Sequence, residues 1–307
     1  DATKGWLPLE DDVVADEPVA PTIQKGIFAF GYTSSVQSMS NLVTSAGVIG
    51  TDVTGVGTAR FYIGSTSYGA DKAIFAYGYQ NATTTYVSMS NLVSNSGVVA
   101  SDVTGVGTVR KYLAAARYGT DKAIFAYGDN ASTNLSMSNL VSNSGVIAED
   151  VTGVGTARAG LAASSYGGDK AIFAYGYTGS QSNLVNNSGV IAADVTGVGT
   201  ARYGLAAASY GGDKGIFAFG FSSGNKSMSN LVSNSGVIAS DVTGVGTARQ
   251  QLAATNYGGD KAMFAYGYVD ATVSLKNLVS NSGVVASDVT GVGTERRLLG
   301  AAGYALG

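Results

Sequence analysis

Two kinds of apolar segment alternate along this chain, and the alternation recurs with the same order in each copy. In the copy that follows Arg158, residues 161–166 are small and mostly apolar, whereas residues 170–175 carry apolar side chains on both faces of an extended strand. Gly167-Gly168-Asp169 between them predicts a tight hairpin turn. A strand that is apolar on both faces has to be covered on both sides. The pattern therefore predicts antiparallel strands packed between neighbouring layers.

The same copy continues with two further extended segments. A third strand is expected near residues 182–185, and Asn187-Ser188-Gly189 predicts a second hairpin turn in which Gly supplies a positive φ. A fourth strand is expected over residues 190–195. No segment shows the 3.6-residue apolar period of a helix, which argues against a helical solenoid. One unit is thus predicted to hold four short antiparallel strands.

Two phrases mark six imperfect copies of a unit of about 47 residues. The phrase Asp-Val-Thr-Gly-Val-Gly-Thr begins at Asp52, Asp102, Asp150, Asp194, Asp241 and Asp288. An arginine follows each copy, at Arg60, Arg110, Arg158, Arg202, Arg249 and Arg296. An apolar phrase ends at Gly31, Gly78, Gly128, Gly176, Gly220 and Gly267. Four-stranded units of this length, repeated six times, predict an all-β protein, a six-bladed β-propeller formed by residues 25–307.

The two ends of the repeat array predict how the ring closes. The first unit starts at Lys25 with a second strand that has no first strand before it, and the chain ends with a first strand near residues 297–304. The C-terminal strand is therefore expected to complete the N-terminal blade and to remove the open edges of the ring.

The order of features resembles the Kelch repeat over residues 25–307. Arg is followed by a small-residue strand, a polar turn and an apolar strand ending in Gly. Kelch units carry Gly-Gly where this chain has Gly78-Tyr79, and Trp in the fourth strand where this chain has Val. The phrases Tyr-Gly-Gly-Asp-Lys and Gly-Val-Gly-Thr-Ala-Arg also resemble repetitive proteins of tailed bacteriophages. These resemblances imply a Kelch-like propeller and a component of a phage particle.

Composition narrows the possible chemistry. The chain has no Cys and no His, so it lacks disulfides and the usual zinc ligands and general base, and we expect no metal, cofactor or enzymatic activity. A formal net charge of −3 without a basic stripe argues against nucleic-acid binding. No apolar run approaches the roughly 20 residues of a membrane-spanning helix. The Gly-Val-Gly phrase lacks the strand–loop–helix setting of a nucleotide-binding loop.

Residues 1–24 differ from the repeats in composition. All three Pro and the single Trp of the chain lie there, with a run of acidic residues. The segment reads as an extended arm or linker. It is either a plain tail or an anchor that docks on other proteins of a particle, with Trp6 and Leu7 as its apolar contacts.

Binding is expected on one face of the ring. The loops between second and third strands vary while the rest of each unit repeats, and variable loops on a rigid scaffold commonly bind ligands, although drift would look the same. The candidate residues in and beside these loops are Tyr32, Tyr79, Tyr86, Asn130, Tyr177, Asn225 and Asp270.

The six arginines precede the innermost strands on that face. They either ring the channel mouth and hold a carboxylate or phosphate, or pair with Asp residues and loop carbonyls.

The function predicted from these observations is a structural or host-attachment protein of a bacteriophage virion, tethered to other virion proteins through residues 1–24. Two alternatives remain open. The first is a lectin-like propeller that binds a host surface glycan, and the second is a Kelch-like scaffold that binds proteins. The expected location is the virion, or else secretion.

Overall fold

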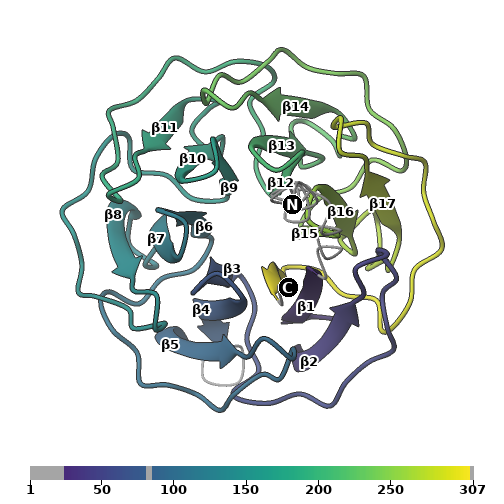
Figure 1. Cartoon of the computed structure of the whole chain (residues 1–307), viewed down its shortest axis with the longest axis horizontal. Coiled ribbons are helices and arrows are strands. Elements are labelled where there is room, and N and C mark those ends of the chain that lie inside the picture. The colour runs from purple at the N-terminus through teal and green to yellow at the C-terminus, as the bar shows by residue number, and fades with distance from the viewer. Residues whose placement is uncertain (1–23, 81–84, 305–307) are drawn as a thin grey trace, which may run out of the picture.

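The computed structural model describes residues 24–80 and 85–304, and these residues form strands, turns and bends. Eighteen strands are arranged as six antiparallel sheets of three strands each around a central axis (Figure 1). Each sheet is a blade, with one strand next to the axis, one in the middle and one outside. The all-β, six-fold repeated, propeller-like architecture expected from the repeats is therefore confirmed.

The three classes of strand correspond to the first three segments of the repeat unit. The inner strands are β3 (Gly64–Tyr68), β6 (Ala114–Tyr118), β9 (Ala162–Tyr166), β12 (Ala206–Tyr210), β15 (Ala253–Tyr257) and β18 (Gly300–Tyr304). The middle strands are β1 (Lys25–Tyr32), β4 (Lys72–Gln80), β7 (Lys122–Asp129), β10 (Lys170–Ala174), β13 (Lys214–Ala218) and β16 (Lys261–Ala265). The outer strands are β2 (Val36–Val43), β5 (Thr85–Val93), β8 (Asn134–Val141), β11 (Ser182–Val185), β14 (Ser229–Val232) and β17 (Lys276–Val279).

The prediction of four-stranded blades was wrong. The segment expected to form a fourth strand touches the outer strand only at isolated bridges, such as Val43↔Ile49 and Ser40↔Val53 in the first blade. Between these bridges the Asn41 side chain donates to the backbone oxygen of Gly50 at 3.0 Å. A side-chain hydrogen bond thus stands where a fourth strand would form backbone hydrogen bonds. The segment runs around the periphery instead of extending the sheet.

The first and last described strands meet in one blade. Strand β18 pairs with β1 in the register Lys25↔Tyr304 through Ala29↔Gly300, and Figure 1 shows yellow β18 beside purple β1. The expected completion of the N-terminal blade by the C-terminal strand is present. The arm predicted for residues 1–24, with Trp6 and Leu7, lies outside the described residues except for Gln24.

The hydrophobic core is divided among the contacts between neighbouring blades. In one such layer, Ile74 and Ala76 of β4 pack with Leu113 and Phe125 of the following blade, and all four are buried. Middle strands are buried on both faces, as their two-sided apolar pattern requires. Each blade is therefore stable only between two neighbours.

In three of the six blades the glycine that ends the apolar phrase marks a β-bulge. In β4 the register shifts between Ala76 and Gly78, and Gly78 has a φ of 112°. A Cβ at Gly78 would lie 2.8 Å from the backbone oxygen of Phe61 and 2.6 Å from the Ile63 side chain. Only glycine fits this close approach of middle and inner segments. The bulge sets the direction in which the chain enters the variable loop.

Candidate functional site

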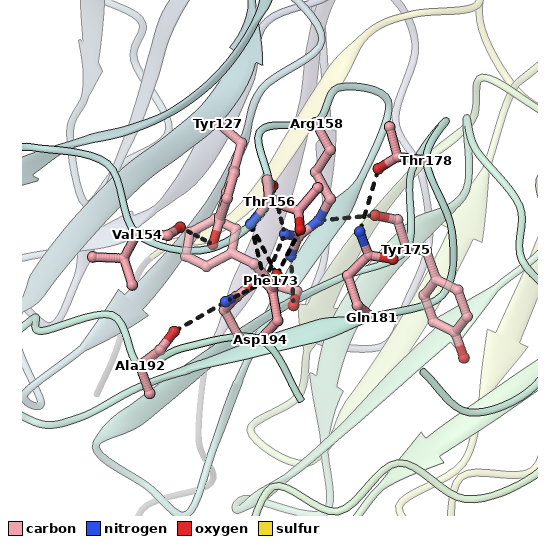
Figure 2. A network of polar contacts seen from close by, with 11 residues as sticks. Tyr127, Val154, Thr156, Arg158, Phe173, Tyr175, Thr178, Gln181, Ala192 and Asp194 are labelled. Atoms are coloured by element: carbon pink, nitrogen blue, oxygen red, sulfur yellow. Dashed lines mark hydrogen bonds and ion pairs between the residues drawn. The ribbon is translucent and has the colours of Figure 1, made fainter. Parts of the chain in front are cut away.

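The six repeated arginines form interblade clasps. Each guanidinium is 0–1% exposed. Figure 2 shows the clasp of Arg158, whose Nε donates to Tyr175 O at 3.1 Å and whose Nη1 donates to Thr156 O at 3.2 Å. The guanidinium also lies 4.2 Å from the centre of the Tyr127 ring in the preceding blade. Arg158 thus joins two blades through a cation–π contact and backbone acceptors.

An aspartate from the adjoining repeat completes each clasp. Asp194 Oδ1 lies 3.8 Å from Arg158 Nη1, and Asp194 Oδ2 accepts a 2.6 Å hydrogen bond from Thr156 Oγ1. Asn183 Nδ2 donates to Asp194 Oδ1 at 2.9 Å. The phrase Asp-Val-Thr-Gly-Val-Gly-Thr therefore supplies both halves of the contact. Its Thr belongs to one copy and its Asp to the next.

Electrostatics keeps the clasps charged near neutral pH. Burial lowers the pKa of Arg60 and Arg249 to about 10, with Asp102 and Asp288 acting against this shift. For Asp194, burial acts to raise the pKa. Hydrogen bonds from Thr156 and Asn183, together with the charge of Arg158, more than offset it, so the pKa lies below its ordinary value.

The six arginines were one candidate for a ring at the channel mouth. The guanidiniums are buried between blades and do not line the mouth of the axial channel. Of the two arrangements expected for these arginines, the structure has the one in which each pairs with an Asp and with backbone carbonyls, and the ring at the channel mouth was wrong. An anion at these positions would have to displace the carbonyl and Asp partners of each guanidinium, and in four of the six an Asn Oδ1 as well.

The mouth of the channel on the loop face is formed by the second residue after each arginine. These residues are Tyr62, Tyr112, Gly160, Gly204, Gln251 and Leu298. Each backbone N–H donates to the carbonyl of the equivalent residue one blade earlier, at 2.7–3.2 Å, and Tyr62 N closes the circle on Leu298 O. All six have a φ between 56° and 72°. Four of them are not glycine, although positive φ is costly for other residues.

A cavity of about 90 Å³ opens at this mouth. Its floor consists of equivalent apolar residues of the six blades, which are Ile63, Leu113, Leu161, Leu205, Leu252 and Leu299. Its edge breaks the six-fold symmetry, because tyrosines crowd one side and Gly204, Gln251 and Leu298 occupy the other. The buried Gln251 Oε1 has no hydrogen-bond partner among the described residues. This oxygen is shielded from solvent, so a ligand hydroxyl would reach it only if the Gln251 side chain turned toward the cavity.

Four tyrosines form a continuous strip along the cavity, and we call Tyr62, Tyr112, Tyr177 and Tyr203 the aromatic rim. Successive ring centres are 3.8, 5.6 and 4.2 Å apart. Tyr177 is 45% exposed. Burial, together with the neighbouring Tyr62 and Tyr177, raises the pKa of Tyr112, so this hydroxyl stays protonated. The aromatic rim presents partly buried rings with polar tips to the cavity.

A lysine and more aromatic rings extend this surface outward. Lys111 Nζ lies 4.8–5.5 Å from the ring centres of Tyr62, Tyr79, Tyr86 and Tyr112. On the other side of Tyr62, the Phe61 ring is 4.6 Å away and in turn lies 5.3 Å from Tyr32. The cation–π contacts hold these rings in a fixed arrangement.

The predicted loop residues separate into two groups. Tyr32, Tyr79, Tyr86 and Tyr177 belong to the aromatic surface just described. Asn130 accepts hydrogen bonds from Ser132 N and Thr133 N within its own loop, at 3.2 and 3.0 Å. Asn225 donates to Val269 O at 3.1 Å, and Asp270 is exposed. The last three lie in separate loops and are not brought to the mouth.

Sequence reasoning missed the residues nearest the axis. Tyr62, Tyr112, Lys111, Tyr203 and Gln251 were not predicted as site residues. The sequence did contain a signal for them. No two copies have the same pair of residues after the arginine, whereas the phrase before the arginine is nearly constant. Aligning the copies at that position would have found them.

Comparison with known proteins yields no identification. No protein-family model matches the chain, and no curated protein matches it. Among the described residues, no cluster of three or more Asp or Glu side chains is placed to hold a metal ion. Within the same part of the chain, no helix is long and apolar enough to cross a bilayer.

Proposed function

We propose that this protein is a non-enzymatic attachment module that binds carbohydrate at the channel mouth of its loop face. The observation that carries the proposal is the aromatic rim beside an apolar cavity with an unpaired acceptor, Gln251 Oε1. Sugar rings present C–H-rich faces that pack on tyrosine and hydroxyls that need polar partners. Tyrosine rings and a single amide at one site meet both needs.

The setting we propose is the surface of a bacteriophage particle. This part rests on the sequence phrases that resemble repetitive phage proteins. A ring whose blades are joined by six buried clasps would be a rigid support for a binding face outside a cell. Attachment through residues 1–24 to other virion proteins remains a prediction, and it is tested by asking whether a chain without them still joins the particle.

Glycan binding can be tested with two matched chains. The intact protein is screened on a glycan array, and the strongest ligand is titrated by calorimetry against Tyr112→Gly. Glycine suits this position, because Gly160 and Gly204 hold the same backbone conformation in other blades. We expect Tyr112→Gly to fold and to bind about tenfold more weakly, because one stacking ring is lost.

A surface substitution serves as the control. Val237 is 64% exposed on an outer hairpin far along the sheet from the mouth, and Val237→Ala should bind as the unchanged protein does. The proposal fails if no glycan binds at millimolar concentration. It also fails if Tyr112→Gly binds the array ligand with unaltered affinity.

A further inference from the structure

A second cavity lies at the opposite end of the axis, on the face of the tight hairpin turns. Its volume is about 80 Å³, and the inner strands of all six blades line it. Its walls differ in chemistry from those of the mouth, because the inner strands present small side chains and hydroxyls here instead of leucine and tyrosine. This end of the channel suits a polar ligand.

One layer of this cavity contains a single charge. The layer is formed by the residue before the last tyrosine of each inner strand, which is Ser67, Arg117, Ser165, Ser209, Asn256 or Gly303. Arg117 is the only charged side chain among the described residues that line the cavity. Five blades thus place a small or neutral side chain where the sixth places a guanidinium.

Most donors of this layer are not used within the described chain. Ser165 is the exception, because its Oγ donates to the backbone oxygen of Arg117 at 3.0 Å. The Arg117 side chain makes no hydrogen bond or ion pair with any residue in the ranges 24–80 and 85–304, whereas the six clasp arginines are all paired. The side chains of Ser67, Ser209 and Asn256 are likewise without hydrogen-bond partners there. A guanidinium without a protein partner, beside hydroxyl and amide groups that also lack one, suits an acceptor-rich ligand.

The acidic residue that influences Arg117 is Asp121, and it does not pair with the guanidinium. Burial lowers the pKa of Arg117, and the carboxylate of Asp121 acts against that shift. Asp121 Oδ2 is itself engaged at 3.0 Å by Asn143 Nδ2. Asp121 therefore favours the charged form of Arg117 without forming an ion pair with it.

We propose that the turn-face cavity binds a small tetrahedral oxyanion, sulfate or phosphate, with Arg117 as the charged donor and Ser67, Ser209 and Asn256 as neutral donors. A guanidinium fork matches two oxygens of such an anion. With about 30 Å³ as the share of one water in the liquid, the cavity has room for the anion and accompanying water. The site is independent of carbohydrate binding at the mouth.

The chain supplies its own control for this site. Arg117→Ser installs the residue that Ser67, Ser165 and Ser209 already provide at equivalent positions, so the variant should fold normally. Inorganic phosphate and sulfate are titrated by calorimetry in chloride buffer into the intact chain. We expect saturable binding of one anion per chain, at least about tenfold weaker binding by Arg117→Ser, and intermediate binding by Arg117→Lys.

Moving the charge gives a second, independent readout. Because the layer has near six-fold symmetry, Arg117→Ser combined with Ser209→Arg should restore part of the lost affinity. The proposal is overturned if the unchanged protein shows no saturable binding, or if Arg117→Ser binds phosphate as tightly as the unchanged protein. Tyr112→Gly should keep its full affinity for phosphate, so failure at one end of the axis is distinguishable from failure at the other.

Discussion

The clasps between blades and the mouth of the channel differ in how closely they repeat. In all six clasps a Thr hydroxyl donates to an Asp oxygen at 2.6 or 2.7 Å, including the pair Thr294 and Asp52, which are 242 positions apart in the chain. At the mouth, two residues further on from each clasp, the side chains range from glycine to tyrosine. Positions that join blades are thus constrained alike, whereas the position at the edge of the mouth is free to diverge.

Loss of one clasp should have the largest effect. Arg158→Met keeps an aliphatic chain of similar length but leaves Tyr175 O, Thr156 O and Phe173 O without their guanidinium donor. Removal of one partner from a buried ionic network typically costs about 3–5 kcal/mol of unfolding free energy. We expect a loss of about 3 kcal/mol in guanidinium chloride unfolding monitored by circular dichroism.

Lys170→Met is the matched control for that substitution. Lys170 is 43% exposed and pairs with Asp169 only at 3.5 Å in a hairpin turn, so its loss should change stability by less than about 0.5 kcal/mol. Equal losses in the two variants would contradict the view that the clasps, rather than surface pairs, join the blades.

Acid should weaken all six clasps together. The carboxyl pKa of each clasp aspartate is lowered, because hydrogen bonds from Thr and Asn and the arginine charge outweigh the opposing effect of burial. The unfolded chain, with an Asp pKa of about 3.9, then binds more protons than the native chain. Stability should be nearly constant from pH 7 to pH 5 and should fall below about pH 4.

Unfolding midpoints at a series of pH values test this directly. Asp194→Asn removes one titrating clasp, so the variant should be less stable at pH 7 and should lose less stability on acidification than the unchanged protein. A pH dependence identical in both chains would assign the acid sensitivity to other groups.

The repeat pattern made most of the fold predictable from sequence. The turn Gly167-Gly168-Asp169 and the two-sided apolar strand after it predicted β9 and β10 to within a residue at each end, and β11 over Ser182–Val185 matches in full. The first unit has a middle strand with no inner strand before it, and the last has an inner strand with no middle strand after it. This arrangement predicted the pairing of β1 with β18. Local turn chemistry and strand period were sufficient for these elements.

The fourth strand and the site required tertiary information. Residues 190–195 have the extended pattern of a strand, but Asn183 Nδ2 takes Ala192 O as its acceptor, which a sequence pattern cannot reveal. Likewise, the position of Arg158 just before an inner strand suggested a place near the axis, whereas the backbone oxygens of Tyr175 and Phe173 accept its hydrogen bonds between the blades. Side-chain competition for backbone groups decided both cases.

The smallest expected effect extends the asymmetry of the mouth. Gly204 has a φ of 61°, close to the 59° and 56° of Tyr62 and Tyr112, and a Cβ there would have its nearest neighbour at 3.5 Å, the backbone nitrogen of Gln251. Gly204→Tyr should therefore fold, at a cost of about 1 kcal/mol for a positive φ. We expect the added ring to raise glycan affinity about threefold in calorimetry.

Two variants separate the added ring from the altered backbone. Gly204→Ala carries the same cost in backbone conformation without an aromatic ring, so it should leave glycan affinity unchanged. Gly160→Tyr should fail to add a ring, because a Cβ at Gly160 would lie 2.8 Å from the Tyr177 ring. If Gly204→Tyr and Gly204→Ala bind the glycan equally, the sequence divergence at the mouth does not serve carbohydrate binding. The tyrosines would then be tolerated only because the circle of backbone hydrogen bonds beneath them holds the six blades together.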